Sequence, residues 1–262
     1  MAPVPTVGLN DGVTIPQLGF GTYGVDQDEV EIALATGYRS LDTATIYSNE
    51  EGVGRAIVAS GIPREALFVT TKVWDDQQGY DATLRSFEGS RKRLGLEVVD
   101  LFLIHWPVPQ LDLYVETWRA LEELLADGDV RAIGVSNFDR EHLDRLAEET
   151  STVPALNQVE LNPHIARPGL REYHAAHGIA TEAWAPLARA SDLLDEPAVT
   201  EPAERHGKTP AQIVLRWAIE LGIVAIPRSS KKERIEENLD VFDFELTADE
   251  VERISALDQG PA

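Results

Sequence analysis

Four polar residues of complementary chemistry each lie at or just beyond the end of a short apolar run. They are Asp42 in YRSLDTATIY, Tyr47 shortly after it, Lys72 in LFVTTKVW and His105 in VVDLFLIHWP. A tyrosine with its usual pKa of about 10 is too weak an acid near neutral pH unless something stabilises its phenolate. A lysine ammonium beside the phenol lowers that pKa, and an aspartate beside the lysine keeps the ammonium charged. With a histidine to hold the substrate oxygen, this set predicts proton donation to a carbonyl group during its reduction.

Short apolar runs alternate with helical patterns along the chain. Strands are expected at residues 17–21, 38–42, 67–72, 99–105, 132–136, 155–160, 180–183 and 224–227. Helices are expected near residues 27–36, 50–60, 80–94, 115–126, 139–149, 169–177, 209–221 and 232–238. Several of these helices are followed by a glycine, which is typical of a helix end. Eight strand-then-helix units predict an α/β fold, a (β/α)8 TIM barrel.

Two further elements flank the predicted barrel. An N-terminal β-hairpin is expected from residues 4–9 and 13–15, around the turn Asn10-Asp11-Gly12. A C-terminal helix is expected after Leu246, because Thr247 and Glu250 fit a capping box. No linker or shift in composition divides the chain, so we expect a single domain over residues 1–262.

A barrel would bring the four polar residues together. The C-terminal ends of all strands of a TIM barrel meet on one face, where active sites lie. Asp42, Lys72 and His105 would end the second, third and fourth strands, and Tyr47 would lie on the loop after the second. Each residue alone could be a local cap, a solvated charge or a structural histidine. Their convergence on one face favours an active site.

Composition narrows the class of protein. The 262 residues are 43% hydrophobic and 26% charged, which is typical of a soluble globular protein. The net charge of −22 argues against nucleic acid or an anionic membrane as a partner, because both bind a basic face. The absence of cysteine excludes disulfides and thiolate metal sites. No signal peptide or membrane-spanning run is indicated, so a cytoplasmic protein is expected.

A glycine-rich motif near the N-terminus offers a competing interpretation. Residues 19–24, GFGTYG, match the pattern of a Rossmann dinucleotide site and lie about 20 residues before Asp42. However, Asp26, Asp28 and Glu29 would open the following helix and would repel a pyrophosphate there. We therefore expect the glycines to let the first strand pass close to a ligand instead.

A group of four cations lies after the eighth predicted strand. Arg228, Lys231, Lys232 and Arg234 follow the eighth predicted strand and begin a helix, in a segment that also carries two serines. Hydroxyl groups, cations and amide donors at a helix N-terminus favour an anion, and TIM barrels frequently bind phosphate at this position. A solvated run of charges is the alternative, but it does not explain why cations concentrate here in an acidic chain.

Asp, Tyr, Lys and His in this order on strand ends resemble the active site of the aldo-keto reductases. The resemblance covers nearly the whole chain, through the segments LGFGTYG, LDTATIYSNEEGVGRAI, KVW, LIHWP, IGVSNF, NQVELNP, EAWAPL and IPRSSKKERIEENLDVFDFEL. The last segment is most similar to the bacterial branch that includes the 2,5-diketo-D-gluconate reductases. The resemblance implies an NADPH-dependent reductase of aldehydes and ketones, with Tyr47 as the proton donor.

The resemblance also implies which residues hold NADPH. Those expected at the phosphoribose are Arg228, Ser229, Ser230, Lys231 and Arg234, and those near the adenine are Glu237 and Asn238. Those expected at the nicotinamide are Ser136, Asn137 and Gln158, which would bind the carboxamide, and Trp184, on which the ring would stack. Relatives more often have lysine at position 228, and arginine is not equivalent to it. The strength of the preference for NADPH over NADH therefore stays open.

Three aromatic residues are expected to form the substrate wall. Tyr23, Trp74 and Trp106 follow the first, third and fourth strands and suit a small carbonyl compound. Such a wall does not distinguish a diketo sugar acid from an α-dicarbonyl, a steroid or a plain aldehyde. The alternative function is a non-catalytic, cofactor-binding barrel with a redox-sensing or regulatory role, which the complete catalytic set disfavours.

Two histidines raise the question of a metal. His174 and His177 are three residues apart on a predicted helix, but no carboxylate or cysteine pattern completes a site around them. We expect surface histidines and no metal. A monomer is the common state of the family that the chain resembles, and we expect one here.

Overall fold

A small antiparallel hairpin precedes the barrel. The computed structural model describes residues 4–190 and 192–260, and it begins with β1 (Thr6–Gly8) and β2 (Thr14–Pro16). The two strands pair with Val7 opposite Ile15, so the predicted hairpin is confirmed. Leu9 and Ile15 are buried against Leu101 and Leu156, which lie inside the barrel. The hairpin therefore closes the N-terminal end of the barrel with apolar side chains.

Eight parallel strands form the central sheet. They are β3 (Phe20–Gly21), β4 (Ser40–Asp42), β5 (Phe68–Val73), β6 (Val99–Ile104), β7 (Val130–Ser136), β8 (Leu156–Glu160), β9 (Ala180–Trp184) and β10 (Val224–Ala225). Each strand pairs with the next in chain order. The sheet then closes on itself, because Leu18 pairs in parallel with Ala225 and the Gly21 amide donates to the Pro227 carbonyl at 3.1 Å. The predicted TIM barrel is confirmed.

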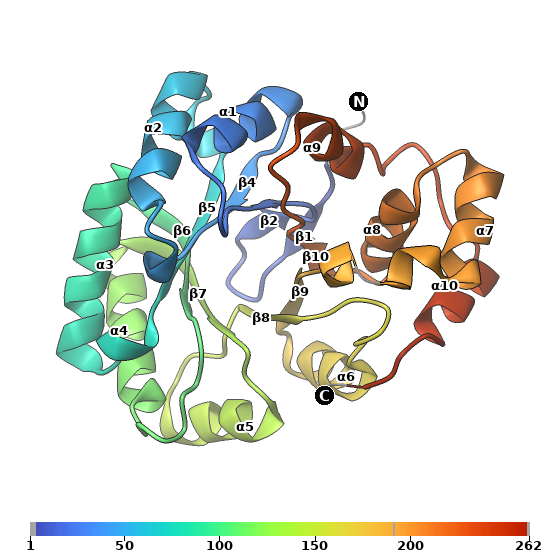
Figure 1. Cartoon of the computed structure of the whole chain (residues 1–262). Coiled ribbons are helices and arrows are strands. Elements are labelled where there is room, and N and C mark those ends of the chain that lie inside the picture. The colour runs from blue at the N-terminus through green and yellow to red at the C-terminus, as the bar shows by residue number, and fades with distance from the viewer. Residues whose placement is uncertain (1–3, 191, 261–262) are drawn as a thin grey trace.

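Helices surround the strands (Figure 1). They are α1 (Gln27–Thr36), α2 (Glu50–Ser60), α3 (Tyr80–Leu94), α4 (Tyr114–Asp127), α5 (Arg140–Glu149), α6 (Pro168–His177), α7 (Pro197–His206), α8 (Pro210–Glu220), α9 (Lys232–Leu239) and α10 (Ala248–Ser255). Short 3-10 turns lie between them at η1 (Thr45–Tyr47), η2 (Arg64–Ala66), η3 (Asp75–Gln77), η4 (Ala188–Ala190) and η5 (Asp192–Asp195). Within the described ranges, no helix is long and apolar enough to cross a membrane.

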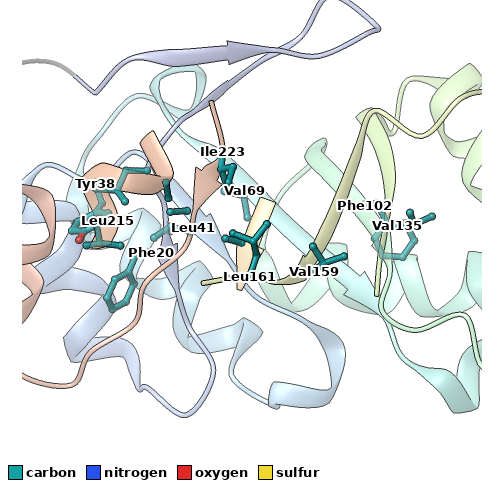
Figure 2. Close-up of a cluster of buried hydrophobic side chains, with 14 of the residues drawn as sticks. Phe20, Tyr38, Leu41, Val69, Phe102, Val135, Val159, Leu161, Leu215 and Ile223 are labelled. Carbon is teal, nitrogen blue, oxygen red and sulfur yellow. The ribbon is translucent and has the colours of Figure 1, made fainter. Parts of the chain in front are cut away.

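The main hydrophobic core lies between the strands and the helices. Leu41, Val69 and Phe102 of three neighbouring strands belong to one buried cluster with Leu215 of α8 (Figure 2). All six residues of β5 (FVTTKV) and of β6 (VDLFLI) are buried, because strands covered on both faces have no side that faces water. This burial fixes the strands, and with them the residues at the C-terminal ends.

Helix α7 was not predicted. Its sequence, PAVTEPAERH, contains Pro202 inside the helix, and an internal proline removes a backbone donor and disfavours a helix. The helix forms because Val199 and Ala203 are buried in the main core. The C-terminal helix was predicted correctly: the Thr247 hydroxyl accepts from the Glu250 amide, and Glu250 accepts from the Thr247 amide, as a capping box requires.

The glycine-rich motif serves barrel closure. A Cβ at Gly19 would lie 3.0 Å from Ser40 Oγ, and one at Gly21 would lie 3.0 Å from the Ile226 carbonyl oxygen. The glycines thus allow β3 to approach its two neighbouring segments closely. That the glycines also let the first strand pass close to a ligand stays a prediction. The barrel also excludes the Rossmann alternative.

Candidate active site

A buried ion pair lies at the C-terminal ends of β4 and β5. Lys72 Nζ donates to Asp42 Oδ1 at 2.6 Å and to the Thr43 carbonyl oxygen at 3.0 Å. Asp42 lies opposite Thr70 in the strand register, so Lys72 extends beyond it toward the open end of the barrel. Burial alone would lower the pKa of Lys72, but Asp42 and Tyr47 raise it above its usual value. The ammonium therefore stays charged.

Tyr47 ends the short turn η1 beside this pair. The Thr45 hydroxyl donates to the Lys72 carbonyl oxygen at 2.7 Å, which ties the turn to β5. Lys72 Nζ lies 5.4 Å from the centre of the Tyr47 ring. Burial raises the pKa of Tyr47, Lys72 lowers it and Asp42 raises it, with a net rise. The lysine thus acts in the expected direction without bringing the pKa below its usual value, and the phenol keeps its proton.

His105 follows β6 and faces the same group. Its ring centre lies 5.7 Å from that of Tyr47 and 5.0 Å from that of Trp74. Burial, reinforced by the charge of Lys72, lowers the pKa of His105 to about 2, so the imidazole is neutral. Nδ1 is buried without a hydrogen-bond partner among the described residues. Nε2 is therefore the ring nitrogen that can meet a substrate oxygen.

A second buried carboxylate, not predicted, extends the site. Glu182 on β9 is 1% exposed and accepts a hydrogen bond from Gln158 Nε2 at 2.7 Å. Gln158 Nε2 also donates to Asp42 Oδ2 at 2.8 Å. Burial, and then the charge of Asp42, raise the pKa of Glu182 to about 8. The sequence signal was an acidic residue inside a buried strand, ATEAW, where an uncompensated charge is costly.

The residues predicted for the nicotinamide form one hydrogen-bonded group. Ser136 Oγ donates to the Gln158 carbonyl oxygen at 2.8 Å and accepts from Asn137 Nδ2 at 3.0 Å. Asn137 Nδ2 also donates to the His105 carbonyl oxygen, and Asn137 Oδ1 accepts from Trp184 Nε1 at 2.9 Å. The cluster adjoins the catalytic candidates through His105 and through Gln158.

The predicted phosphate residues lie after β10, at the start of α9. Arg228, Lys231 and Arg234 are exposed and make no ion pair within the described residues, whereas Lys232 pairs with Glu236 at 3.6 Å. Ser229 Oγ accepts from the Lys231 amide at 3.1 Å, and Ser230 is exposed.

The two residues predicted to lie near the adenine are less exposed to solvent than the cations. The Glu237 carboxylate accepts from the Thr209 hydroxyl at 2.6 Å, and Asn238 is 4% exposed. The structure therefore gathers three cations that have no ion-pair partner among the described residues, beside the hydrogen-bonded Glu237 and the buried Asn238.

The predicted aromatic wall is only partly assembled. Tyr23 packs edge-on against Tyr47 with ring centres 5.1 Å apart, and Trp74 packs edge-on against His105. Trp106 is 39% exposed and makes no ring contact within the described residues. The Arg228 guanidinium lies 5.8 Å from the Tyr23 ring centre, so the cationic group borders the aromatic one.

The histidine pair on α6 has a structural role. His174 is fully buried between Asn157 Nδ2 and the Thr181 hydroxyl, each at 2.9 Å, so its placement on the surface was wrong. The ring of His177 stacks on Tyr173 instead. Among the described residues, no group of three or more His, Cys, Asp or Glu side chains could hold a metal ion.

A closed parallel barrel thus carries a Tyr–Lys–Asp–His cluster, with cations unpaired among the described residues, at the C-terminal ends of its strands, an arrangement that fits a barrel oxidoreductase. The chain belongs to the aldo/keto reductase family, whose model matches residues 18–259. It is therefore an enzyme of the class that reduces carbonyl groups with NADPH. Nothing in the comparisons supports the alternative of a non-catalytic barrel.

Two curated relatives and two solved structures illustrate the similarity. A glyoxal reductase of Bacillus subtilis is 48% identical, covering 97% of this chain and 93% of the relative. A methylglyoxal reductase of Salmonella typhimurium is 45% identical, covering 99% and 96%. A Brucella melitensis aldo/keto reductase structure is 52% identical with a TM-score of 0.94, covering 97% and 100%. A mutant protein solved with NADPH is 45% identical with a TM-score of 0.94, covering 98% and 95%.

Proposed function

We propose that this enzyme reduces small aldehydes and α-dicarbonyl compounds, with Tyr47 as the proton donor. The observation that carries the assignment is the fully buried Lys72, whose Nζ lies 5.4 Å from the centre of the Tyr47 ring. Asp42 holds Lys72 by a hydrogen bond of 2.6 Å. A phenolate formed after proton donation would be stabilised by this ammonium, because opposite charges at close range lower the cost of ionisation.

The hydrogen-bonding capacity left in the Ser136 group fits the nicotinamide carboxamide. Both amide hydrogens of Asn137 and both of Gln158 are already used by protein acceptors. What remains is acceptor capacity, at Ser136 Oγ, Asn137 Oδ1 and Gln158 Oε1. A carboxamide presents an NH2 group with two donors, which is the complement of these acceptors.

The free cations fit the phosphates of NADPH. Arg228, Lys231 and Arg234 have no carboxylate partner in the described part of a chain that carries 45 acidic residues. Unpaired cations at a helix N-terminus attract a phosphate through charge and amide donors. We place the 2′-phosphate with them, with Ser229 and Ser230 as hydroxyl donors, and the adenine toward Glu237 and Asn238.

Each residue of the site has one proposed task. NADPH, when bound, supplies the hydride to the carbonyl carbon. Neutral His105 donates from Nε2 to the carbonyl oxygen and orients it, and Tyr47 gives its proton to that oxygen. Tyr23, Trp74 and Trp106 exclude water from the substrate side, and Trp184 supports the nicotinamide ring. Aimed donors of this kind typically contribute about 10²–10⁴-fold in rate.

Small neutral substrates suit the charge of the protein. The two named relatives are reductases of glyoxal and methylglyoxal. A net charge of −22 disfavours the approach of an anionic sugar acid, whereas an uncharged dicarbonyl feels no such repulsion. We further propose that the chain works as a monomeric single-domain enzyme in the cytoplasm and does not bind nucleic acid.

A substrate panel tests the proposal. NADPH oxidation is followed by absorbance with methylglyoxal, glyoxal, a plain aldehyde and 2,5-diketo-D-gluconate. We expect the dicarbonyls to give a higher kcat/KM than the sugar acid. Turnover of the sugar acid alone would overturn the substrate class. NADPH binding without turnover of any carbonyl compound would overturn the assigned reaction.

A further inference from the structure

Glu182 lies next to the amide of Gln158 on the neighbouring strand. The two residues are register partners in the β8–β9 pair, and both are almost fully buried. Strand pairing therefore fixes their separation, and Gln158 Nε2 donates to Glu182 Oε2 at 2.7 Å. The second donor of the same nitrogen is taken by Asp42 Oδ2 at 2.8 Å.

Two carboxyl acceptors determine which way the Gln158 amide faces. The amide nitrogen of a glutamine offers two hydrogens and its oxygen offers two lone pairs. The terminal amide can therefore turn by 180° unless neighbouring groups favour one orientation. Asp42 Oδ2 and Glu182 Oε2 both accept from the nitrogen. With the nitrogen held by both, Oε1 is the free end of the amide, and no hydrogen bond is recorded at it within the described residues.

Asp42 alone would hold the amide less firmly. Its other oxygen already accepts from Lys72, so its orientation is set by the ion pair. If Glu182 were apolar, one Gln158 hydrogen would be left buried without an acceptor, which is a costly arrangement. The Gln158 amide would then be more stable if it turned toward other partners, and its Oε1 would no longer have a fixed position.

We propose that Glu182 is a positioning residue that holds the Gln158 amide so that Oε1 receives the carboxamide NH2 of the nicotinamide. This inference rests on the proposed placement of the nicotinamide at Gln158. Glu182 itself touches neither cofactor nor substrate. It acts by removing the alternative orientation of the amide before NADPH binds, which is preorganisation of the site.

The acceptor role does not depend on the charge of Glu182. With a pKa raised to about 8, the carboxyl is mostly protonated at neutral pH, and a protonated carboxyl still offers a carbonyl oxygen. Glutamine at position 182 would offer the same oxygen in the same shape. Leucine or alanine would offer none. Comparing glutamine with leucine or alanine at position 182 therefore separates loss of the ionisable group from loss of the hydrogen-bond acceptor.

The test compares binding of NADPH with binding of adenosine 2′,5′-bisphosphate, which lacks the nicotinamide half. Glu182→Leu should raise the Kd for NADPH about fivefold to tenfold, the effect of one positioned hydrogen bond. It should leave the Kd for the bisphosphate within about twofold. Glu182→Gln should keep the Kd for NADPH close to that of the natural protein. Glu182→Ala provides a second acceptor-free variant if the leucine disturbs folding.

Two further variants keep the outcomes distinct. Glu250→Leu removes a fully buried glutamate of α10, far along the chain from the site, and should change neither Kd. In the double variant with Gln158→Leu, removing Glu182 should add no further loss. If Gln158→Leu weakens NADPH and neither acceptor-free variant does, the role of Glu182 is overturned. If Gln158→Leu also leaves NADPH affinity unchanged, the nicotinamide placement itself is wrong.

Discussion

One ammonium serves several partners in the site. Lys72 is hydrogen-bonded to Asp42 and lies beside the Tyr47 ring, and Glu182, when ionised, also raises its pKa. Because it is fully buried, it must keep a negative or ionisable partner to remain charged. Loss of Lys72 would therefore raise the pKa of the proton donor Tyr47 and leave Asp42 buried without its cation.

The first prediction follows from this dependence. Lys72→Met should lower kcat for reduction by about 10²-fold or more, because the Tyr47 phenolate loses its stabilising charge. Reduction needs the protonated phenol, so the rate falls as pH rises through the pKa of Tyr47. Without Lys72 that pKa rises further, and the fall should move to higher pH in the residual activity. Lys208→Met, at an ion pair remote from these residues, is the control. An active variant with an unchanged pH–rate profile would contradict the role.

The raised pKa of Glu182 predicts a pH-dependent stability. Its pKa is about 8 when folded and near 4.5 when unfolded, so the folded state binds more protons between these values. The contribution of Glu182 to stability is therefore greatest below about pH 4.5 and is lost as pH rises through about 8. Glu182→Gln should gain stability relative to the natural protein by about 1 kcal/mol or more between pH 5.5 and pH 9. Urea unfolding at both pH values measures this, and a difference that does not grow with pH would refute the shift.

The four catalytic candidates could be recognised from the sequence, whereas the sequence marked Glu182 only as an acidic residue within a strand and did not show its partner. Asp42, Lys72 and His105 each follow an apolar run, so their place at a strand end is readable. Glu182 lies within a strand, and only the barrel register shows that it faces Gln158 rather than a helix. Its role depends on a contact between strands, which a linear pattern does not contain.

Close packing of β7 against its neighbouring strands fixes the position of this strand in the barrel. A Cβ at Gly134 of β7 would lie 2.6 Å from the Leu156 carbonyl oxygen and 2.8 Å from Leu103 Cδ2. No such contact is tolerated without a backbone shift. β7 carries Ser136 at its C-terminal end, so a shift there would also reach the proposed nicotinamide group.

A glycine substitution tests this packing. Gly134→Ala should lower the free energy of unfolding by about 1–3 kcal/mol, the usual cost of overpacking a core. Gly169→Ala in α6 is the matched control, because nothing lies within 4 Å of its Cβ and its φ is not in the left-handed region. It should be neutral or slightly stabilising. Equal unfolding midpoints in urea for the two variants would show that β7 is not tightly packed.

Helices and strands were predicted correctly where the hydrophobic periodicity and the capping residues indicated the same element. The prediction failed where tertiary packing determines the structure. The long runs of β5 and β6 and the glycine-terminated helices were identified near their observed bounds. Helix α7 was missed because Pro202 argues against a helix locally, while burial of Val199 and Ala203 favours it. Barrel closure by Leu18 and Ala225 depends on strands that are far apart in the chain.

Charge is distributed unevenly over the whole molecule. The chain has 45 acidic and 23 basic residues, yet Arg228, Lys231 and Arg234 remain unpaired, among the described residues, at one end of the barrel. An acidic protein that retains free cations at one position maintains a local attraction for an anion. The sequence predicted this cluster because the cations are adjacent in the chain.

Cofactor choice follows from that cluster. Arg234→Ala should raise the Kd for NADPH about tenfold and change that for NADH little, because NADH has no 2′-phosphate. Added salt should weaken NADPH more than NADH for the same reason. Arg85→Ala removes an exposed arginine of α3 as a control. If the natural protein binds both cofactors equally, or Arg234→Ala weakens both alike, the phosphate site is misplaced.

Tyr47 is the proposed proton donor of the whole enzyme. Tyr47→Phe keeps the ring and removes only the hydroxyl, and Tyr23→Phe does the same at the exposed tyrosine that packs against it. The decisive measurement is kcat for reduction of methylglyoxal by both variants, with NADPH affinity determined alongside. We expect kcat to fall at least about 10²-fold in Tyr47→Phe and to stay near normal in Tyr23→Phe, with NADPH affinity retained in both. If Tyr47→Phe keeps more than about a tenth of the natural kcat, another group supplies the proton and the account is wrong.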